Sequence, residues 1–200
     1  MPRLADHDQR RAQITTAARK VIARGGLAAA TFQSVAAEAG ISVRLVQYYF
    51  GTKQEVLAAT HLSVVAAAGD RFARNIAALG ESAPPREILA TVFNELLPWD
   101  ETRREEAIIL IAFHTAALTT DDVEPKDTAG PGLWLMNAVA DQLRRVRPAE
   151  TPAAATQLIL DAQLLVAAVG GMTQGMLTIP QSATDADALI DRLLDRFLSP

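Results

Sequence analysis

FQSVAAEAGISVRLVQYYFGTK, residues 32–53, carries the clearest structural pattern in the chain. Its pattern predicts two short helices joined by a tight turn, because Ala36, Gly40 and Val46 stand where such a unit needs them. Ala36 is small enough for two helices to cross, Gly40 can take a positive φ at the bend, and Val46 can hold the second helix in place. The stretch therefore predicts a helix-turn-helix, although many other helical pairs also carry a single glycine in their turn.

The second helix of this unit, residues 43–49, would turn polar side chains outward. Val46 and Phe50 are four residues apart and define its buried side, so Tyr48 and Tyr49 cannot both point inward. Outward side chains of this kind can donate to phosphates and to base edges in a major groove. DNA binding is therefore the function that the pattern favours, with an outward set of Arg44, Gln47, Tyr48 and Tyr49.

The N-terminal residues also resemble a known family of regulators. The resemblance is carried by Gly26-Leu27, Thr31, Ser34-Val35-Ala36, Ala39-Gly40-Ile41-Ser42, Tyr48-Tyr49-Phe50 and Lys53. Over residues 1–60 the chain is similar to the DNA-binding domain of TetR/AcrR transcriptional regulators, with no gap needed. The resemblance implies an all-helical homodimer with three N-terminal DNA-binding helices and a larger ligand-sensing body. It also implies a repressor of a palindromic operator that a small molecule releases.

Pattern and resemblance together give the residues expected to contact DNA. Thr31 and Ser42 are placed as N-caps, and a helix N-terminus pointed at a phosphate gains from its exposed N–H groups. The resemblance places Tyr48 near the DNA backbone and Tyr49 at the groove, and it gives Lys53 a phosphate contact. The expected DNA contacts are Thr31, Gln33, Ser34, Ser42, Val43, Arg44, Leu45, Gln47, Tyr48, Tyr49 and Lys53.

The charge of the chain is divided unevenly along its length. The net charge of −4 argues mildly against nucleic acid as a partner. Residues 1–60, however, carry eight basic and four acidic residues, a net +4, which leaves 11 basic and 19 acidic residues, a net −8, in residues 61–200. Such a division would make only the N-terminal part attractive to DNA. Ordinary scatter of surface charge is the alternative explanation.

The remainder of the chain reads as one helix after another, which predicts an all-α fold. A first helix over residues 8–24 would pack on the helix-turn-helix, and a long helix over residues 53–79 would follow it. Residues 120–132 are polar and contain proline and glycine, which predicts a loop before a helix over residues 133–147.

These patterns divide the chain into two expected domains. Residues 1–60 would form the three-helix DNA-binding domain, and residues 61–200 a helical ligand-binding and dimerisation bundle. The segment LLPWDETRREEAIILIAFHTAALT, residues 96–119, also resembles the body domain of BetI-like members of the family. The resemblance implies that the long helix transmits a change in the body to the DNA-binding domain.

A ligand pocket in the body is only weakly marked in the sequence. A mainly apolar pocket would favour an apolar or amphipathic effector. The bulky or soft side chains expected around it are Phe93, Trp99, Phe113, His114, Trp134, Met136, Met172 and Met176. Plain core packing is the alternative for each of them. For His114, the polar residue within an apolar run, the alternative is a buried histidine bonded to a neighbour.

The last two expected helices have more apolar surface than a small body can cover, which suggests a four-helix interface in a homodimer. The expected interface residues are Leu158, Leu165, Val169, Leu189, Leu193 and Phe197. An intramolecular core is the alternative. The 23 uncharged residues between Asp161 and Asp185 are long enough to span a bilayer, but Gly170, Gly171 and Pro180 interrupt them, so we expect no membrane partner.

Other classes of protein find little support in the sequence. The chain has no cysteine, no glycine-rich phosphate loop and no HExxH motif, and its three histidines lie far apart. We therefore expect no enzyme, no catalytic or metal-binding residues and no cofactor. Cysteine usage and the lack of an apolar signal core favour a cytoplasmic protein. A helical ligand-binding protein, or an enzyme of unknown type, without DNA binding is the alternative.

Overall fold

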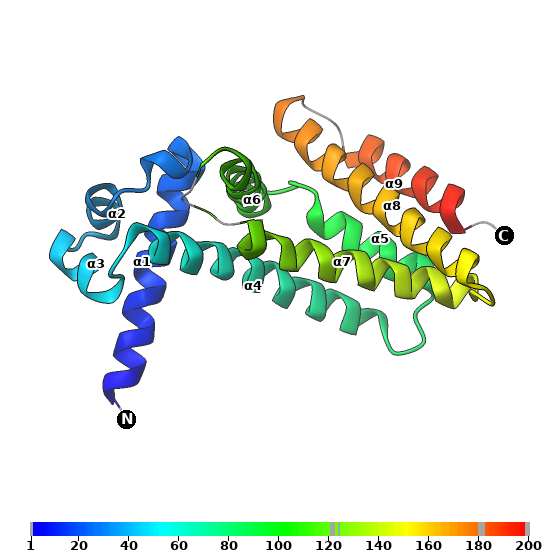
Figure 1. Cartoon of the computed structure of the whole chain (residues 1–200), viewed down its shortest axis with the longest axis horizontal. Helices are drawn as coiled ribbons and strands as arrows, with labels where there is room; N and C mark the ends of the chain where they lie inside the picture. The colour runs from blue at the N-terminus through cyan, green and yellow to red at the C-terminus, as the bar shows by residue number, and fades with distance from the viewer. Residues whose placement is uncertain (1, 121–122, 124, 180–182, 199–200) are drawn as a thin grey trace. The chain divides into compact units, whose positions relative to one another are not determined.

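The computed structural model describes the backbone of residues 2–120, 123, 125–179 and 183–198. Every regular element in these residues is an α-helix, which confirms the predicted fold class (Figure 1). The helices are α1 (Pro2–Ala29), α2 (Phe32–Ala39), α3 (Val43–Tyr49), α4 (Lys53–Leu79), α5 (Pro85–Leu96), α6 (Glu101–Thr119), α7 (Pro125–Val146), α8 (Pro152–Thr178) and α9 (Ala183–Leu198).

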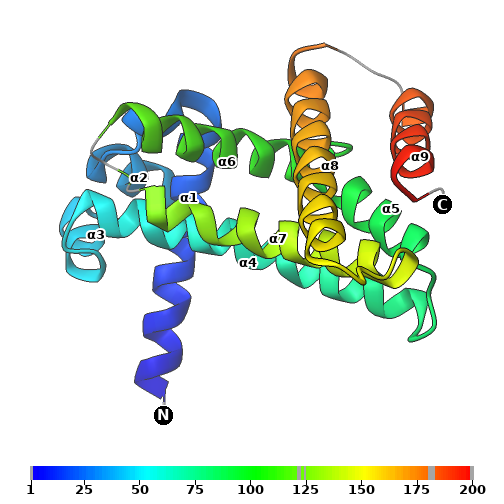
Figure 2. The same cartoon turned by 45° about the vertical axis from the view of Figure 1, so that its right-hand side comes forward.

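The helices form two compact units. Unit 1 consists of residues 1–67 and 108–128, and unit 2 consists of residues 68–107 and 129–200. In unit 1, α2 packs on α1 and α3 packs on α2, whereas in unit 2 α5 packs on α8 and α9 (Figure 2). The long helix α4 contributes its first half to unit 1 and its second half to unit 2. The predicted functional division at residue 60 stays a prediction.

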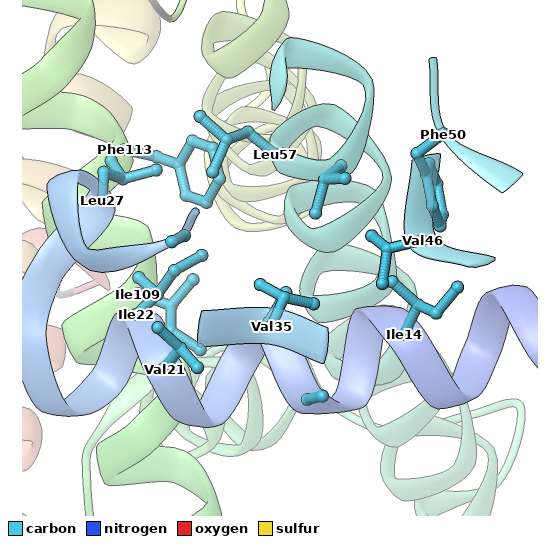
Figure 3. Packing of buried hydrophobic residues seen from close by; sticks show 14 of the residues in the cluster. Ile14, Val21, Ile22, Leu27, Val35, Val46, Phe50, Leu57, Ile109 and Phe113 are labelled. Atoms are coloured by element: carbon cyan, nitrogen blue, oxygen red, sulfur yellow. The ribbon is translucent and has the colours of Figure 1, made fainter. Parts of the chain in front are cut away.

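The core of unit 1 is built from the apolar stripe of α1. Ile14, Ala18 and Ile22 are completely buried, and they recur at the spacing that places side chains on one face of a helix. They pack against Val35, Val46 and Phe50 from α2, α3 and the residue after it (Figure 3). Burying a side chain of this size contributes about 1.5–3 kcal/mol, so the position of α3 is fixed by apolar contacts on its inner side.

Two glycines mark the ends of helices in unit 1. Gly40 has φ 67° and ends α2, and its N–H donates to Ala36 and Ala37. This is the positive φ that the sequence predicts at the bend, and a side chain would strain it. Gly26 has φ 72° and ψ 179° and breaks α1 two residues after the predicted end of the first helix at residue 24. The helix resumes after this break and ends at Ala29.

The core of unit 2 contains three residues that the sequence placed at the dimer interface. Leu158, Leu165 and Val169 are 4%, 0% and 0% exposed and pack within this core, as the alternative of an intramolecular core expects, and their contact with a second subunit stays a prediction. α8 is apolar nearly all round, and such a helix does not reveal from its sequence which side faces inward. Its exposed apolar side chains are Ile159, Leu160 and Leu164. On α9, Leu189 is exposed, and Leu193 and Phe197 are partly buried.

Unit 2 also buries charge. Glu95 and Glu106 are 8% and 4% exposed, and both pair with the guanidinium of Arg71 at 3.2 and 2.6 Å. Arg103 lies 3.4 Å from the other oxygen of Glu95. Asp161 is 7% exposed and pairs with Arg147 at 2.8 Å. These pairs join α4 to α5 and α6, and the end of α7 to α8.

The predicted loop over residues 120–132 is partly wrong. α7 begins at Pro125 and contains Pro131, whereas residues 121, 122 and 124 lie outside the described residues. Proline is well suited to the first turn of a helix, which accounts for Pro125. Composition is a weak local preference that tertiary packing can override, and the polar Pro/Gly pattern was therefore misleading here.

One helix in the described part of the chain, α8, is long and apolar enough to cross a membrane, with 27 residues and a hydropathy of 1.5. Core helices of soluble proteins can be equally long and apolar. Asp161, which is buried and ion-paired with Arg147, lies within this helix.

Candidate nucleic-acid interface

The start of α2 is closed by a reciprocal pair of hydrogen bonds. The Ser34 N–H donates to Thr31 Oγ1 at 3.1 Å, and the Thr31 N–H donates to Ser34 Oγ at 2.9 Å. This capping box satisfies two backbone donors that have no partner in the helix. Thr31 and Gln33 are exposed and Ser34 is partly buried. The predicted cap at Thr31 is therefore confirmed, while contact of these residues with DNA stays a prediction.

The short helix α3 has one completely buried side and one exposed side. Val46 and Phe50 are both 0% exposed, as the sequence predicts, and the Leu45 N–H donates to the cap at Ser42 Oγ at 3.2 Å. Arg44 and Gln47 are exposed, and Tyr48 is 76% exposed. A large aromatic side chain that remains this exposed beside an arginine and an amide presents stacking, donor and acceptor groups together.

Three residues of α3 that were predicted to touch DNA are only partly exposed. Val43 and Tyr49 pack against the core of unit 1, and Leu45 is partly buried. The ring of Tyr49 lies 4.9 Å from that of His7 and 5.2 Å from that of Tyr48. Tyr49 therefore lies at the border between the core and the outer side of α3.

The beginning of α4 borders this surface. Lys53 is the first residue of α4 and is partly buried. The Glu55 N–H donates to Thr52 Oγ1 at 3.2 Å, and Glu55 Oε2 accepts from the Gly51 N–H at 3.1 Å. These bonds confirm the predicted start of the long helix at residue 53. They also place the lysine in the first turn, where the helix dipole disfavours a cation.

Two side chains of α1 donate hydrogen bonds to the carboxyl ends of α2 and α3, which the sequence pattern did not predict. Gln13 Nε2 donates to the Ala39 carbonyl at 2.9 Å, and Arg11 Nη1 donates to the Tyr49 carbonyl at 2.6 Å. The guanidinium carbon of Arg11 also lies 4.0 Å from the centre of the Phe50 ring. No sequence spacing signals these contacts, because the Arg11 bond joins residues 38 positions apart.

The charge of Glu38 in unit 1 is compensated by nearby cations. Glu38 forms ion pairs with Arg24 and, at 3.8 Å, with Lys20. The hydrogen bond from Arg24 lowers the pKa of the Glu38 carboxyl below its ordinary value. The carboxylate of Glu55 accepts from the backbone at the start of α4. Arg44 remains exposed on α3, so the outer side of this helix is left with a positive charge.

The residues predicted for a ligand pocket do not all come together. Phe93, Trp99, Met172 and Met176 lie in or against the core of unit 2, whereas Phe113 belongs to the core of unit 1. Met136 is partly buried, and Trp134 is 55% exposed and stacks 6.5 Å from Phe72. His114 is exposed, so it is not the buried polar residue that its apolar run suggested. The buried histidine is His61, whose ring lies 4.9 Å from that of Phe113.

No group of three or more His, Cys, Asp or Glu side chains that could hold a metal ion occurs among the described residues. The ion pairs of unit 2 join carboxylates to arginines.

Comparison with known proteins identifies similar sequences and folds. The family described as bacterial regulatory proteins, tetR family, matches residues 14–60. The transcriptional regulator PksA of Bacillus subtilis is 32% identical over 140 residues, which is 70% of this chain and 67% of that protein. The regulator BetI of Rhizobium meliloti is 30% identical over 123 residues, which is 62% of this chain and 59% of that protein. A transcriptional regulator from Rhodococcus sp. Rha1 has the same fold, with a TM-score of 0.80, 25% identity and coverage of 94% of this chain and 95% of that one.

Proposed function

Because this chain belongs to the TetR family of bacterial regulatory proteins, we propose that it is a cytoplasmic, homodimeric repressor that binds a palindromic DNA operator. A small apolar or amphipathic ligand would release it. The relatives are transcriptional regulators rather than enzymes. The observation that carries the proposal is the division of α3 into a fully buried side, Val46 with Phe50, and an exposed polar side.

The proposed DNA contacts follow from the exposure of each side chain. Arg44 and Gln47 on α3 would enter the major groove, and Tyr48 would lie nearer the DNA backbone, since these three are the exposed side chains of that helix. Tyr49, Val43 and Leu45 would contribute at the edge of this surface, where they are partly exposed. Thr31, Gln33, Ser34, Ser42 and Lys53 flank α3 in the fold and would bind phosphates, which position the protein on the duplex.

A second copy of the chain would double this surface. Closed two-fold symmetry pairs one surface patch with its own copy, and the exposed, uncharged residues of α8, Ile159, Leu160 and Leu164, offer an apolar patch for this. With Leu189 of α9 exposed as well, α8 and α9 of two subunits would form the interface. The two α3 helices would then occupy successive major grooves about 34–36 Å apart.

The effector would bind in unit 2 and act on α4. Phe93, Trp99, Met172 and Met176 supply the apolar surroundings that small-molecule sites use. α4 contributes residues to both units, so a change in the packing of its second half would be passed along a continuous helix. A ligand can act in this way only if it binds one arrangement more tightly than the other.

Selection of bound sequences from random duplexes tests the proposal. We expect a palindromic sequence, with an affinity that falls as salt rises because cations on the protein displace counterions from DNA. Arg44→Ala should lower affinity for the selected duplex, whereas Arg74→Ala, which removes an exposed cation from unit 2, should leave it unchanged. Failure to enrich any sequence, or equal affinities for the wild type and Arg44→Ala, would contradict the assignment of α3.

A further inference from the structure

We propose that Arg11 is a positioning residue that fixes the orientation of α3, so that α1 determines how sharply the recognition surface discriminates between DNA sequences. The inference rests on the proposed function for its DNA part, and on contacts within unit 1 for its structural part. Arg11 is partly buried and uses two parts of its guanidinium: one N–H donates to the Tyr49 carbonyl, and the flat group lies over the Phe50 ring.

A helix as short as α3 needs support from outside. It has seven residues, and a helix of that length is unstable in isolation. Its last carbonyls have no partner within the helix. The carbonyl of Val46 accepts from the Phe50 N–H at 2.9 Å, and that of Tyr49 accepts from Arg11 at 2.6 Å. The final turn of α3 therefore depends on a donor that α1 supplies, 38 positions away in the sequence.

The chemistry of this contact requires arginine rather than any cation. A guanidinium is planar, so it can donate in its own plane while its face lies against an aromatic ring. The Phe50 ring is 0% exposed and is held by the core, so it provides a fixed surface for that face. A lysine ammonium could donate to the Tyr49 carbonyl, but it has no flat face to keep the helix end at a set angle.

A neighbouring turn of α1 extends the contact. His7 lies four residues before Arg11, on the same side of α1, and its ring lies 4.9 Å from that of Tyr49. Gln13 forms a similar bond with the end of α2, because its Nε2 donates to the Ala39 carbonyl at 2.9 Å. The carboxyl ends of both helices of the helix-turn-helix are thus bonded to α1, in addition to the apolar contacts on their inner sides.

Positioning and direct phosphate binding by Arg11 predict different measurements. Removal of a residue that binds a phosphate lowers the affinity for all DNA sequences. The slope of log affinity against log salt concentration then becomes shallower by about 0.9. A residue that orients α3 changes the ratio of affinities for the selected and a scrambled duplex, because base contacts need correct geometry. If the Arg11 bond only stabilised the fold, its loss would leave this affinity ratio unchanged in a variant that is still folded.

The experiment compares the wild type with Arg11→Gln, Arg11→Lys and Lys20→Gln in the full chain. Lys20→Gln is the matched control, since it also removes one positive charge from α1 but its ion pair is with Glu38 of α2. Circular dichroism first establishes that each variant is folded at the working temperature. We expect Arg11→Gln to lower the affinity ratio about tenfold, on the scale of one misread base pair, with an unchanged salt slope. The affinity ratio of Arg11→Lys should remain below that of the wild type, and the ratio of Lys20→Gln should equal that of the wild type.

A second measurement needs no DNA. Hydrogen exchange of the Phe50 N–H should be about tenfold faster in Arg11→Gln, if the contact contributes on the order of 1.4 kcal/mol to holding the last turn. The same amide should be unchanged in Lys20→Gln. If the wild type binds no duplex selectively, the proposed function fails. The exchange rates then still test whether Arg11 stabilises the last turn of α3. An unchanged exchange rate in Arg11→Gln, or an unchanged affinity ratio, would overturn the positioning role.

Discussion

The two units of the molecule bury different chemistry. Among the described residues of unit 1, the buried polar side chains are threonines and His61, and no buried carboxylate occurs. Unit 2 buries Glu95, Glu106 and Asp161, each paired with an arginine. An apolar core is stabilised in proportion to the area it buries, whereas buried ion pairs depend on complete pairing because an unpaired buried charge is costly. The two units should therefore respond to different kinds of substitution.

The chain itself provides a probe for each unit. Both tryptophans, Trp99 and Trp134, lie in unit 2, and both tyrosines, Tyr48 and Tyr49, lie in unit 1. Tryptophan fluorescence thus follows unit 2, while circular dichroism follows the helices of both. Separate transitions by the two probes would show that the units unfold independently, and coincident ones that they unfold together.

Removing Arg71 should have the largest effect. Arg71→Met would leave Glu95 and Glu106 without their shared guanidinium and should lower the free energy of unfolding of unit 2 by about 3–5 kcal/mol. The pairing with Glu106, above all its hydrogen bond, raises the pKa of Arg71 above its ordinary value, so this side chain is charged at every working pH. Urea denaturation followed by tryptophan fluorescence measures the loss. Arg74→Ala, at an exposed position of the same helix, is the control. Equal urea midpoints for Arg71→Met and Arg74→Ala would contradict the claim that unit 2 depends on its buried ion pairs.

Shortening a core side chain of unit 1 should have the next largest effect. Ile22→Ala deletes apolar atoms from a side chain that is 0% exposed, which should cost about 2–5 kcal/mol. Hydrogen exchange in α1–α3 should report this loss directly. Ala28→Gly, at an exposed position of the same helix, should be much milder. Slow exchange retained throughout α1–α3 in Ile22→Ala would show that unit 1 is not held by this core.

A smaller effect is expected at the second ion pair of unit 2. Arg147→Met would remove the cation from Asp161, whose other oxygen still accepts from Gln157 at 3.2 Å. Because one hydrogen bond to the carboxylate remains, the expected loss is about 1–3 kcal/mol. The midpoint of the tryptophan transition measures it. The double variant Arg147→Met with Asp161→Leu should recover part of the loss, and a further loss in that variant would contradict the explanation.

The smallest effect is expected at the exposed ion pair of unit 1. The hydrogen bond from Arg24 lowers the pKa of Glu38 below its ordinary value of 4.5, so the pair stabilises the folded state above that pH and its contribution is lost as the pH falls. Glu38→Gln should therefore differ from the wild type slightly at neutral pH and low salt, and not at all in acid. Thermal unfolding at several pH values measures the difference. A difference that grows as the pH falls would show that the sign is wrong.

Much of unit 1 could be predicted from the sequence, and less of unit 2. Gly40, Thr31 and Ser42 were predictable because turns and caps depend on residues a few positions apart. The inner side of α3 followed from Val46 and Phe50 for the same reason. The burial of Leu158 and Leu165 within one subunit could not be predicted, because a helix that is apolar nearly all round, such as α8, does not show in its sequence which side faces inward. The exposure of His114 was not predicted for the same reason, because an uncharged run does not show which side of α6 faces inward.

The helical fold, the helix-turn-helix and the outward side chains of α3 could be predicted from the amino acids alone, because periodicity, capping and turn preferences act over a few residues. Helix packing, in contrast, established that Arg11 supplies the donor for the end of α3, that Arg71 joins two buried carboxylates, and which side of α8 is exposed. Contacts between residues tens of positions apart depend on where whole helices pack, and no short-range pattern encodes them.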